Sequence, residues 1–440
     1  MFIVEIFDLR SRDQGRRSTF PLEKIKAWTL IDHKQAPQIS TTNNQPNQER
    51  SDTMKTLYDK LRTAQIDEQL INAFQNDSDI VYTGVIQFLS DKDFIMLTYN
   101  DYGIQDGEVY LKISSVKSID TDSYDLANMQ DRIEFDEKHH LNSQPAFDLP
   151  IKMSDSLFDR VIQTLHDDQK VGLVITAQAG KLKYNEGLIS DLQDDGMVFT
   201  NINKFDFSKQ SVFNIRFDDI RGIEFGGTEL QLLQNVLDMI KPENHVENEI
   251  IDDPSVFRDQ IEQLRNSGDW VVIDTNDNRK YFYVGKIISS NEKEFVMMVV
   301  DMNGRFGGYV WIRYDDIGRI ITDSDYLRVI DKFVIENKHN KHFALPVLNS
   351  DRAFDNADNI LIHIITQSIQ YQKVIRFETA DEDNFAGYPT SIDLQTGVLN
   401  VELLDVDDDG DLPTRQIGIE NIREMAFDYF KAFLTENEID

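Results

Sequence analysis

Two stretches of this chain share one pattern: NIRFDDIRGI at residues 214–223 and WIRYDDIGRI at residues 311–320. In both, an aliphatic residue and an arginine precede an aromatic residue, two aspartates and an isoleucine, and the stretches start 97 residues apart. A pattern that recurs at a fixed distance indicates an internal repeat, here with a period of about 100 residues.

A longer match surrounds the second stretch. Residues 83–126 align with residues 284–327 without a gap, at a constant offset of 201. A weaker match at an offset of 200–202 relates the other two copies, so a pair of units looks duplicated. A glycine recurs at one position in the second expected strand of every copy: Gly84, Gly187, Gly285 and Gly387.

We therefore predict four tandem modules of one fold. Each module is expected to open with an amphipathic helix, such as the one spanning residues 155–168, and to continue with five short strands and a short closing helix. Strands this short and turns this close favour a small, strongly bent barrel, so the predicted fold class is α+β with four five-stranded antiparallel barrels. The predicted bounds are 53–135 for module 1, 150–243 for module 2, 252–337 for module 3 and 350–436 for module 4.

The first residues resemble the interior of a module. FIVEIFD at residues 2–8 matches FVMMVVD at residues 295–301, so residues 1–34 are interpreted as a truncated module that begins at its third strand. Three explanations stay open: a misjudged start or decayed module, a split barrel completed by another chain, and chance resemblance. Residues 35–52 are polar and lack periodicity, which predicts a flexible linker.

Charge limits the classes of partner. The chain has 440 residues, with 78 acidic against 45 basic residues and a formal net charge of −33. Such a surface repels phosphate backbones and favours basic protein partners. There is no cysteine, which excludes disulfides, thiolate catalysis and cysteine-ligated zinc.

We expect neither a secretory signal nor a membrane span. Glu5 and Asp8 interrupt the first apolar stretch, and its basic residues follow it rather than precede it. No uninterrupted apolar run approaches about 18–20 residues. A cytoplasmic protein is the default expectation.

A helix followed by five short strands, with glycine in the second strand and an arginine before two aspartates, resembles the Sm-like (LSm) and SH3-like small barrels. The second motif of the Sm-like family is matched around Arg216 and Arg313, although Phe or Tyr stands where the family has glycine. The resemblance implies RNA binding, but the family's pocket asparagine is not kept. The residues at that position are Phe94, Met197, Phe295 and Gly397.

One acidic stretch is a candidate metal site. DVDDDGD at residues 405–411 places Asp405, Asp407 and Asp409 at alternate positions before a glycine, as at the start of an EF-hand-type calcium loop. The twelfth position is Gln416 rather than glutamate, so we interpret the stretch as an acidic hairpin turn. Weak calcium binding by the three aspartates is the alternative.

No motif for catalysis or cofactor binding is found, and we predict no enzyme and no cofactor. An acidic pair follows Arg216 and Arg313, which favours an intramodule salt bridge over phosphate binding. The recurrent aromatic residues are expected to fill the cores rather than stack bases: Phe94, Tyr110, Phe213, Phe295 and Trp311.

These observations predict an acidic tandem-repeat protein that acts in protein–protein interaction or scaffolding. RNA or single-stranded nucleic-acid binding through Sm-like barrels is the alternative, and a hydrolase with a site between modules is a third.

Overall fold

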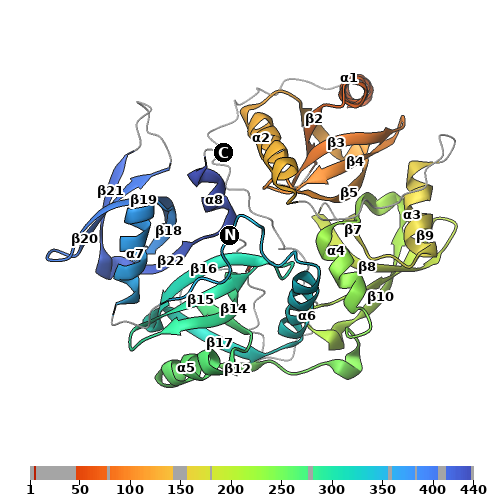
Figure 1. Cartoon of the computed structure of the whole chain (residues 1–440). Coiled ribbons are helices and arrows are strands. Elements are labelled where there is room, and N and C mark those ends of the chain that lie inside the picture. The colour runs from red at the N-terminus through yellow and green to blue at the C-terminus, as the bar shows by residue number, and fades with distance from the viewer. Residues whose placement is uncertain are drawn as a thin grey trace. The chain divides into compact units, whose positions relative to one another are not determined.

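A computed structural model describes residues 4–5, 46–76, 80–141, 156–178, 181–275, 281–354, 359–381, 384–404 and 413–437. The chain divides into two compact units. We call Gly15–Asn244 the N-terminal unit, and Met1–Gln14 together with His245–Asp440 the C-terminal unit. Each unit is built on one antiparallel sheet (Figure 1).

The described residues of the N-terminal unit form a sheet of ten strands in the order β10-β9-β8-β7-β11-β5-β4-β3-β2-β6. The strands of its first half are β2 (Leu70–Gln75), β3 (Val81–Leu89), β4 (Asp93–Tyr99), β5 (Gln105–Lys112) and β6 (Val116–Asp120). Those of its second half are β7 (Gly172–Gln178), β8 (Lys181–Leu192), β9 (Gly196–Asn201), β10 (Ser211–Arg216) and β11 (Ile220–Phe225). Both halves follow the same order, in which the fifth strand pairs with the first.

In the C-terminal unit, the part of the chain that the structure describes forms a sheet of twelve strands, eleven of them in the order β12-β17-β13-β14-β15-β16-β22-β18-β19-β20-β21. Its first half holds β12 (Glu249–Ile251), β13 (Val271–Thr275), β14 (Tyr281–Ser290), β15 (Glu294–Val300), β16 (Phe306–Arg313) and β17 (Ile317–Asp323). Its second half holds β18 (Ile375–Thr379), β19 (Asn384–Asp393), β20 (Val398–Leu403), β21 (Thr414–Gly418) and β22 (Ile422–Phe427). The twelfth strand, β1 (Val4–Glu5), pairs with β14.

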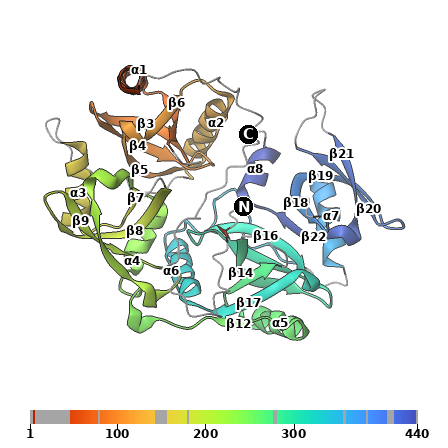
Figure 2. The ribbon, with the colours of Figure 1, turned by 180° about the vertical axis from the view of Figure 1, so that it is seen from behind.

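Helices cover these sheets. In the N-terminal unit they are α1 (Pro46–Ile66), α2 (Tyr124–His139), α3 (Leu157–Asp167) and α4 (Thr228–Val236). In the C-terminal unit they are α5 (Phe257–Ser267), α6 (Asp325–His339), α7 (Ile360–Tyr371) and α8 (Phe430–Glu436). The opening helices α1, α3, α5 and α7 lie against β3, β8, β14 and β19, as Figure 2 shows for α7 and β19. None of the described helices combines the length and apolar character needed to cross a bilayer.

Local signals explain where two of these helices begin. The Ser156 hydroxyl accepts a hydrogen bond from the backbone N–H of Asp159, and the Ser324 hydroxyl accepts one from Leu327, so serine caps both α3 and α6. The helix expected over residues 155–168 is confirmed as α3. By contrast, α1 begins at Pro46, inside the stretch 35–52 that was predicted as a linker.

The predicted fold class is wrong. The described strands form two large antiparallel sheets rather than four separate barrels, and no barrel is closed among them. The reason is visible at β5, whose outer edge pairs with β11 of the following repeat instead of turning back to its own β6. The edge of β16 pairs with β22 in the same way. We call these two pairings the N-terminal joint and the C-terminal joint.

The cores contain the aromatic residues that the sequence indicated. Phe94, Phe295 and Trp311 are fully buried and Tyr110 is almost so, which confirms core packing for these four. Phe213 is part-buried and its ring lies 6.0 Å from that of Phe199. The opening helices contribute one face each, with Val161 and Leu165 of α3 as examples.

Candidate functional site

The four recurrent glycines occupy one structural position, in the second strand of each repeat. Gly84 lies in β3, Gly187 in β8, Gly285 in β14 and Gly387 in β19. A Cβ atom at any of them would overlap a backbone carbonyl oxygen of the neighbouring third strand. That carbonyl belongs to Leu97, Thr200, Met298 and Glu402, respectively. Glycine is therefore required by the close approach of two strands.

A register shift follows each of these glycines by two residues. The shifts lie between Ile86 and Phe88, Ile189 and Asp191, Ile287 and Ser289, and Pro389 and Ser391. An extra residue in one strand bends the sheet locally and increases its twist. The recurrent glycine therefore marks a structural bend and carries no ligand-binding group.

The two candidate arginines have different surroundings. Arg216 ends β10, is two-thirds exposed, and lies 3.7 Å from Asp218, so the predicted intramodule salt bridge is present but long and exposed. Arg313 ends β16 and donates from Nη1 to the Glu420 carbonyl at 2.8 Å and from Nη2 to the Ile419 carbonyl at 2.7 Å. The second arginine thus fastens the C-terminal joint.

A side-chain cation also bonds a backbone carbonyl at the N-terminal joint. Lys112 ends β5, and its Nζ donates to the Phe217 carbonyl at 2.7 Å. The three acceptor carbonyls lie in short 3₁₀ turns before a fifth strand, Phe217–Asp219 in one unit and Ile419–Asn421 in the other. A cation at the end of a fourth strand therefore holds the turn that precedes the fifth strand of the next repeat.

A tyrosine and a glutamate meet at each joint. Tyr82 of β3 donates a hydrogen bond to Glu224 of β11, and Tyr283 of β14 donates one to Glu424 of β22. The two tyrosines stand two residues before the recurrent glycine of their strand, and the two glutamates belong to fifth strands. Each bond crosses from one repeat to the next within a unit.

The C-terminal pair has a cation, and among the described residues no cation is bonded to the N-terminal pair. Arg376 of β18 donates from Nη2 to Glu424 at 2.7 Å and to the Tyr283 hydroxyl at 3.0 Å. Between β18 and β22, Arg376 lies opposite Ala426. The corresponding positions in the N-terminal unit, between β7 and β11, hold Leu173 and Glu224. Leucine thus stands where the other unit has the arginine.

Burial changes the titration of Glu224. Loss of hydration raises the pKa of Glu224 to about 7, and the charges of Asp106, Glu229 and Glu186 act in the same direction. The hydrogen bond from Tyr82 lowers it only in part. Burial also raises the pKa of Glu108, on β5, to about 7.

Glu224→Gln is expected to reduce the pH dependence of folding. The folded pKa lies above the ordinary 4.5, so the folded chain binds more protons between these values and its stability falls as pH rises from about 4.5 to about 7. The full pKa shift corresponds to a loss of stability of about 3 kcal/mol. Solvent reaches the part-buried side chain and reduces this loss. Urea unfolding at several pH values measures it, and an equal fall in the variant would contradict the assignment.

A buried ion pair braces the second repeat. Lys204, in the loop after β9, lies 3.1 Å from Glu186 of β8 and also contacts Glu229 of α4. Lys204 and Glu186 are almost inaccessible to solvent. Burial raises the pKa of Glu186, and the ammonium group of Lys204 opposes that rise. The pair ties a strand, a loop and a helix together.

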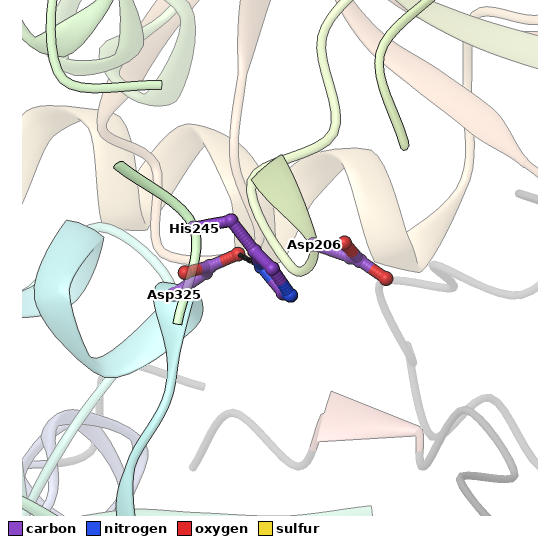
Figure 3. Close-up of side chains that lie close together, drawn as sticks. All are labelled: Asp206, His245 and Asp325. Atoms are coloured by element: carbon purple, nitrogen blue, oxygen red, sulfur yellow. Dashed lines mark hydrogen bonds and ion pairs between the residues drawn. The ribbon is translucent and has the colours of Figure 1, made fainter. Parts of the chain in front are cut away.

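Sequence reasoning missed a histidine–aspartate pair in the C-terminal unit. His245 Nδ1 lies 2.6 Å from Asp325 Oδ2 (Figure 3). The Val246 N–H donates to Asp325 Oδ1 at 2.9 Å. Asp325 is the first residue of α6 and is buried. The pair ties the segment before β12 to the start of α6. Asp206, also labelled in Figure 3, belongs to the N-terminal unit, where it accepts from Ser208.

The remaining predicted candidates lie elsewhere. Asp405, Asp407 and Asp409 are outside the described residues. Of the positions that replace the pocket asparagine of the Sm-like family, Phe94, Met197 and Phe295 are fully buried. Arg376 and Glu424 gave no distinctive signal, because each of their strands holds a second charged residue, Glu378 in β18 and Arg423 in β22.

Comparisons with known proteins add little. No protein-family model and no curated protein matches the chain. One match among solved structures is MrkH of K. pneumonia in its apo state, at 10% sequence identity, covering 42% of this chain and 94% of that chain. Its TM-score of 0.09 is too low to support an argument about fold or function.

Proposed function

We propose that this chain is a non-enzymatic, cytoplasmic interaction protein that binds protein partners through the edges of its sheets. One observation carries the proposal: the chain already joins its own repeats by strand-edge pairing. The outer edges of β5 and β16 receive β11 and β22. Main-chain hydrogen bonds along such an edge do not depend on the side chains of the partner, so segments of many sequences can pair there, as a scaffold requires.

Two corresponding edges are left without a partner strand among the described residues. β10 ends the N-terminal sheet and β21 ends the C-terminal sheet, and both are the fourth strand of their repeat, as β5 and β16 are. An unpaired edge presents a row of backbone N–H and C=O groups that another chain can extend. The net charge of −33 favours partners that carry basic residues.

Nucleic-acid binding, the alternative, has less support. The residues at the pocket position of the Sm-like family are buried in three repeats, so they offer no surface to a base. Arg313 and Lys112 donate to backbone carbonyls at the joints, which occupies two of the cations that a phosphate would need.

Affinity capture of the full tagged chain from lysate at physiological salt tests the proposed function. The eluate is treated with nuclease, and both bound proteins and bound RNA are identified. We expect a stoichiometric protein that survives the nuclease. Discrete RNAs without such a protein would contradict the proposal and support the alternative.

A further inference from the structure

The outer edge of β10 differs from the edges that are already used. β10 spans Ser211–Arg216 and pairs only with β9 among the described strands (Figure 1). Ser211, Val212, Asn214 and Arg216 are exposed, and Val212 is 64% exposed. The strand contains no proline and no bulge, two devices with which proteins block an edge. A six-residue, regular edge is therefore open to pairing.

Arg216 repeats the position of the two joint cations. It ends the fourth strand of its repeat, as Lys112 and Arg313 do. Those two donate to carbonyl oxygens of the segment next to the added strand. Arg216 has instead an exposed contact with Asp218 at 3.7 Å, which an incoming backbone can replace at little cost.

Acidic residues surround the same end of β10. Asp194 and Asp195 lie in the turn between β8 and β9, and Asp218 lies in the 3₁₀ turn after β10; all three are exposed. The Phe217 N–H donates to the Asp195 carbonyl at 3.0 Å, which holds the two turns side by side. Arg216 is the one cation within these two turns and the strand, while Lys112 and Arg221 contact backbone carbonyls of the 3₁₀ turn from outside it. The negative charge at this end of the edge is therefore carried mainly by the exposed turn of Asp194 and Asp195.

We propose that the edge of β10 binds an extended, basic segment of a protein partner, which adds to the N-terminal sheet as an antiparallel strand. This inference rests on the proposed function and names the edge and the chemistry of the partner. The direction follows from the joints, where the added strand is antiparallel. The N-terminal end of an antiparallel strand lies beside Arg216, so the basic residues of the partner precede its strand segment.

Two peptides of the same composition test the direction and the charge together. The probe is fluorescein-labelled Lys-Lys-Lys-Thr-Val-Thr-Val-Thr, which places its lysines beside Asp194, Asp195 and Asp218. The matched peptide, Thr-Val-Thr-Val-Thr-Lys-Lys-Lys, places them at the Ser211 end. Fluorescence anisotropy with the full chain at low salt is expected to give about tenfold tighter binding for the probe. Equal binding of the two peptides would overturn the proposal.

Two sets of protein variants locate the charges. The triple variant Asp194→Asn, Asp195→Asn and Asp218→Asn is expected to weaken the probe about tenfold, since three exposed ion pairs are lost. The control variant Asp67→Asn, Asp122→Asn and Asp131→Asn removes three exposed acids of the same unit that lie in α2 or next to α1 and α2, away from β10. The control variant is expected to change the affinity for the probe less than twofold. If both triple variants weaken binding equally, the attraction depends only on the net charge of the chain, which would contradict the proposal.

Amide hydrogen exchange separates this inference from the proposed function. With the probe bound, the exchange of residues 211–216 is expected to slow. A probe that binds without slowing these residues overturns the β10 assignment, as does self-association in which a second copy covers the edge. If captured proteins survive nuclease while neither peptide binds, the inference fails and the proposed function stands. If capture yields RNA alone, the proposed function fails first.

Discussion

Replacing Gly285 by alanine is expected to destabilise the C-terminal unit by about 3 kcal/mol or more. A single Cβ atom there would overlap the carbonyl oxygen of Met298 on the neighbouring strand. That oxygen belongs to the backbone of β15, which is buried along its whole length, so it cannot move aside without breaking the pairing of β14 and β15. Valine at this position adds further overlap.

Gly307→Ala is the matched control, because this glycine lies in β16 of the same unit and its Cβ would meet the Val299 carbonyl oxygen at an ordinary 3.5 Å. Unfolding in urea is followed by tryptophan fluorescence in a Trp28→Phe background, so that Trp270 and Trp311, both in the C-terminal unit, report alone. Equal shifts of the unfolding midpoint for the two glycine variants would contradict the close-approach explanation.

Arg376→Leu is expected to cost about 3–5 kcal/mol, because it leaves the carboxylate of Glu424 buried without its cation. Glu424 is 1% exposed and accepts from both Arg376 and Tyr283 at the C-terminal joint. The size of the effect comes from the orphaned charge rather than from the lost attraction. The same urea titration measures it.

A second substitution distinguishes these two causes. Adding Glu424→Gln to Arg376→Leu removes the charge and keeps a group that can accept from Tyr283, so most of the lost stability is expected to return. The N-terminal unit already has leucine at this register, in Leu173, beside a glutamate whose pKa is raised to about 7. A double variant as unstable as the single one would contradict the buried-charge assignment.

The sequence was sufficient for features that are set within one repeat. Gly285 and its three counterparts could be aligned because each is required by a local approach of two strands. The helix at 155–168 was recognisable from its apolar spacing and from a capping residue at Asp155 or Ser156, of which the structure shows Ser156. Periodicity and caps report which residues face the core, and these signals survive in a single sequence.

The pairing between repeats could not be predicted in the same way. A strand has two edges, and the pattern of β5 fits either its own fifth strand or that of the next repeat, since both present apolar residues to the core. Closure into barrels was the wrong choice for this reason. Arg313 was also misjudged, since its acceptors are carbonyls of Ile419 and Glu420, about 100 residues away, and carbonyl positions leave no mark on a sequence.

The cluster of polar side chains at the C-terminal joint was harder to predict from the sequence than the strand pairing. Arg376, Tyr283 and Glu424 come from three strands in two repeats, and their meeting depends on the joint itself. Among the residues chosen from the sequence, the acidic turn at Asp405, Asp407 and Asp409 lies outside the described residues, and the glycines serve the fold.

Amide hydrogen exchange of the full chain, alone in solution, is the most direct test of the central claim that fourth strands pair outward and that β10 is left open. In β5, which is paired on both edges, we expect slow exchange at every residue from Glu108 to Leu111. In β10, alternate amides of residues 211–216 are expected to exchange fast, because those on the outer edge have no acceptor strand among the described residues. Slow exchange at every residue of β10 would contradict the open edge.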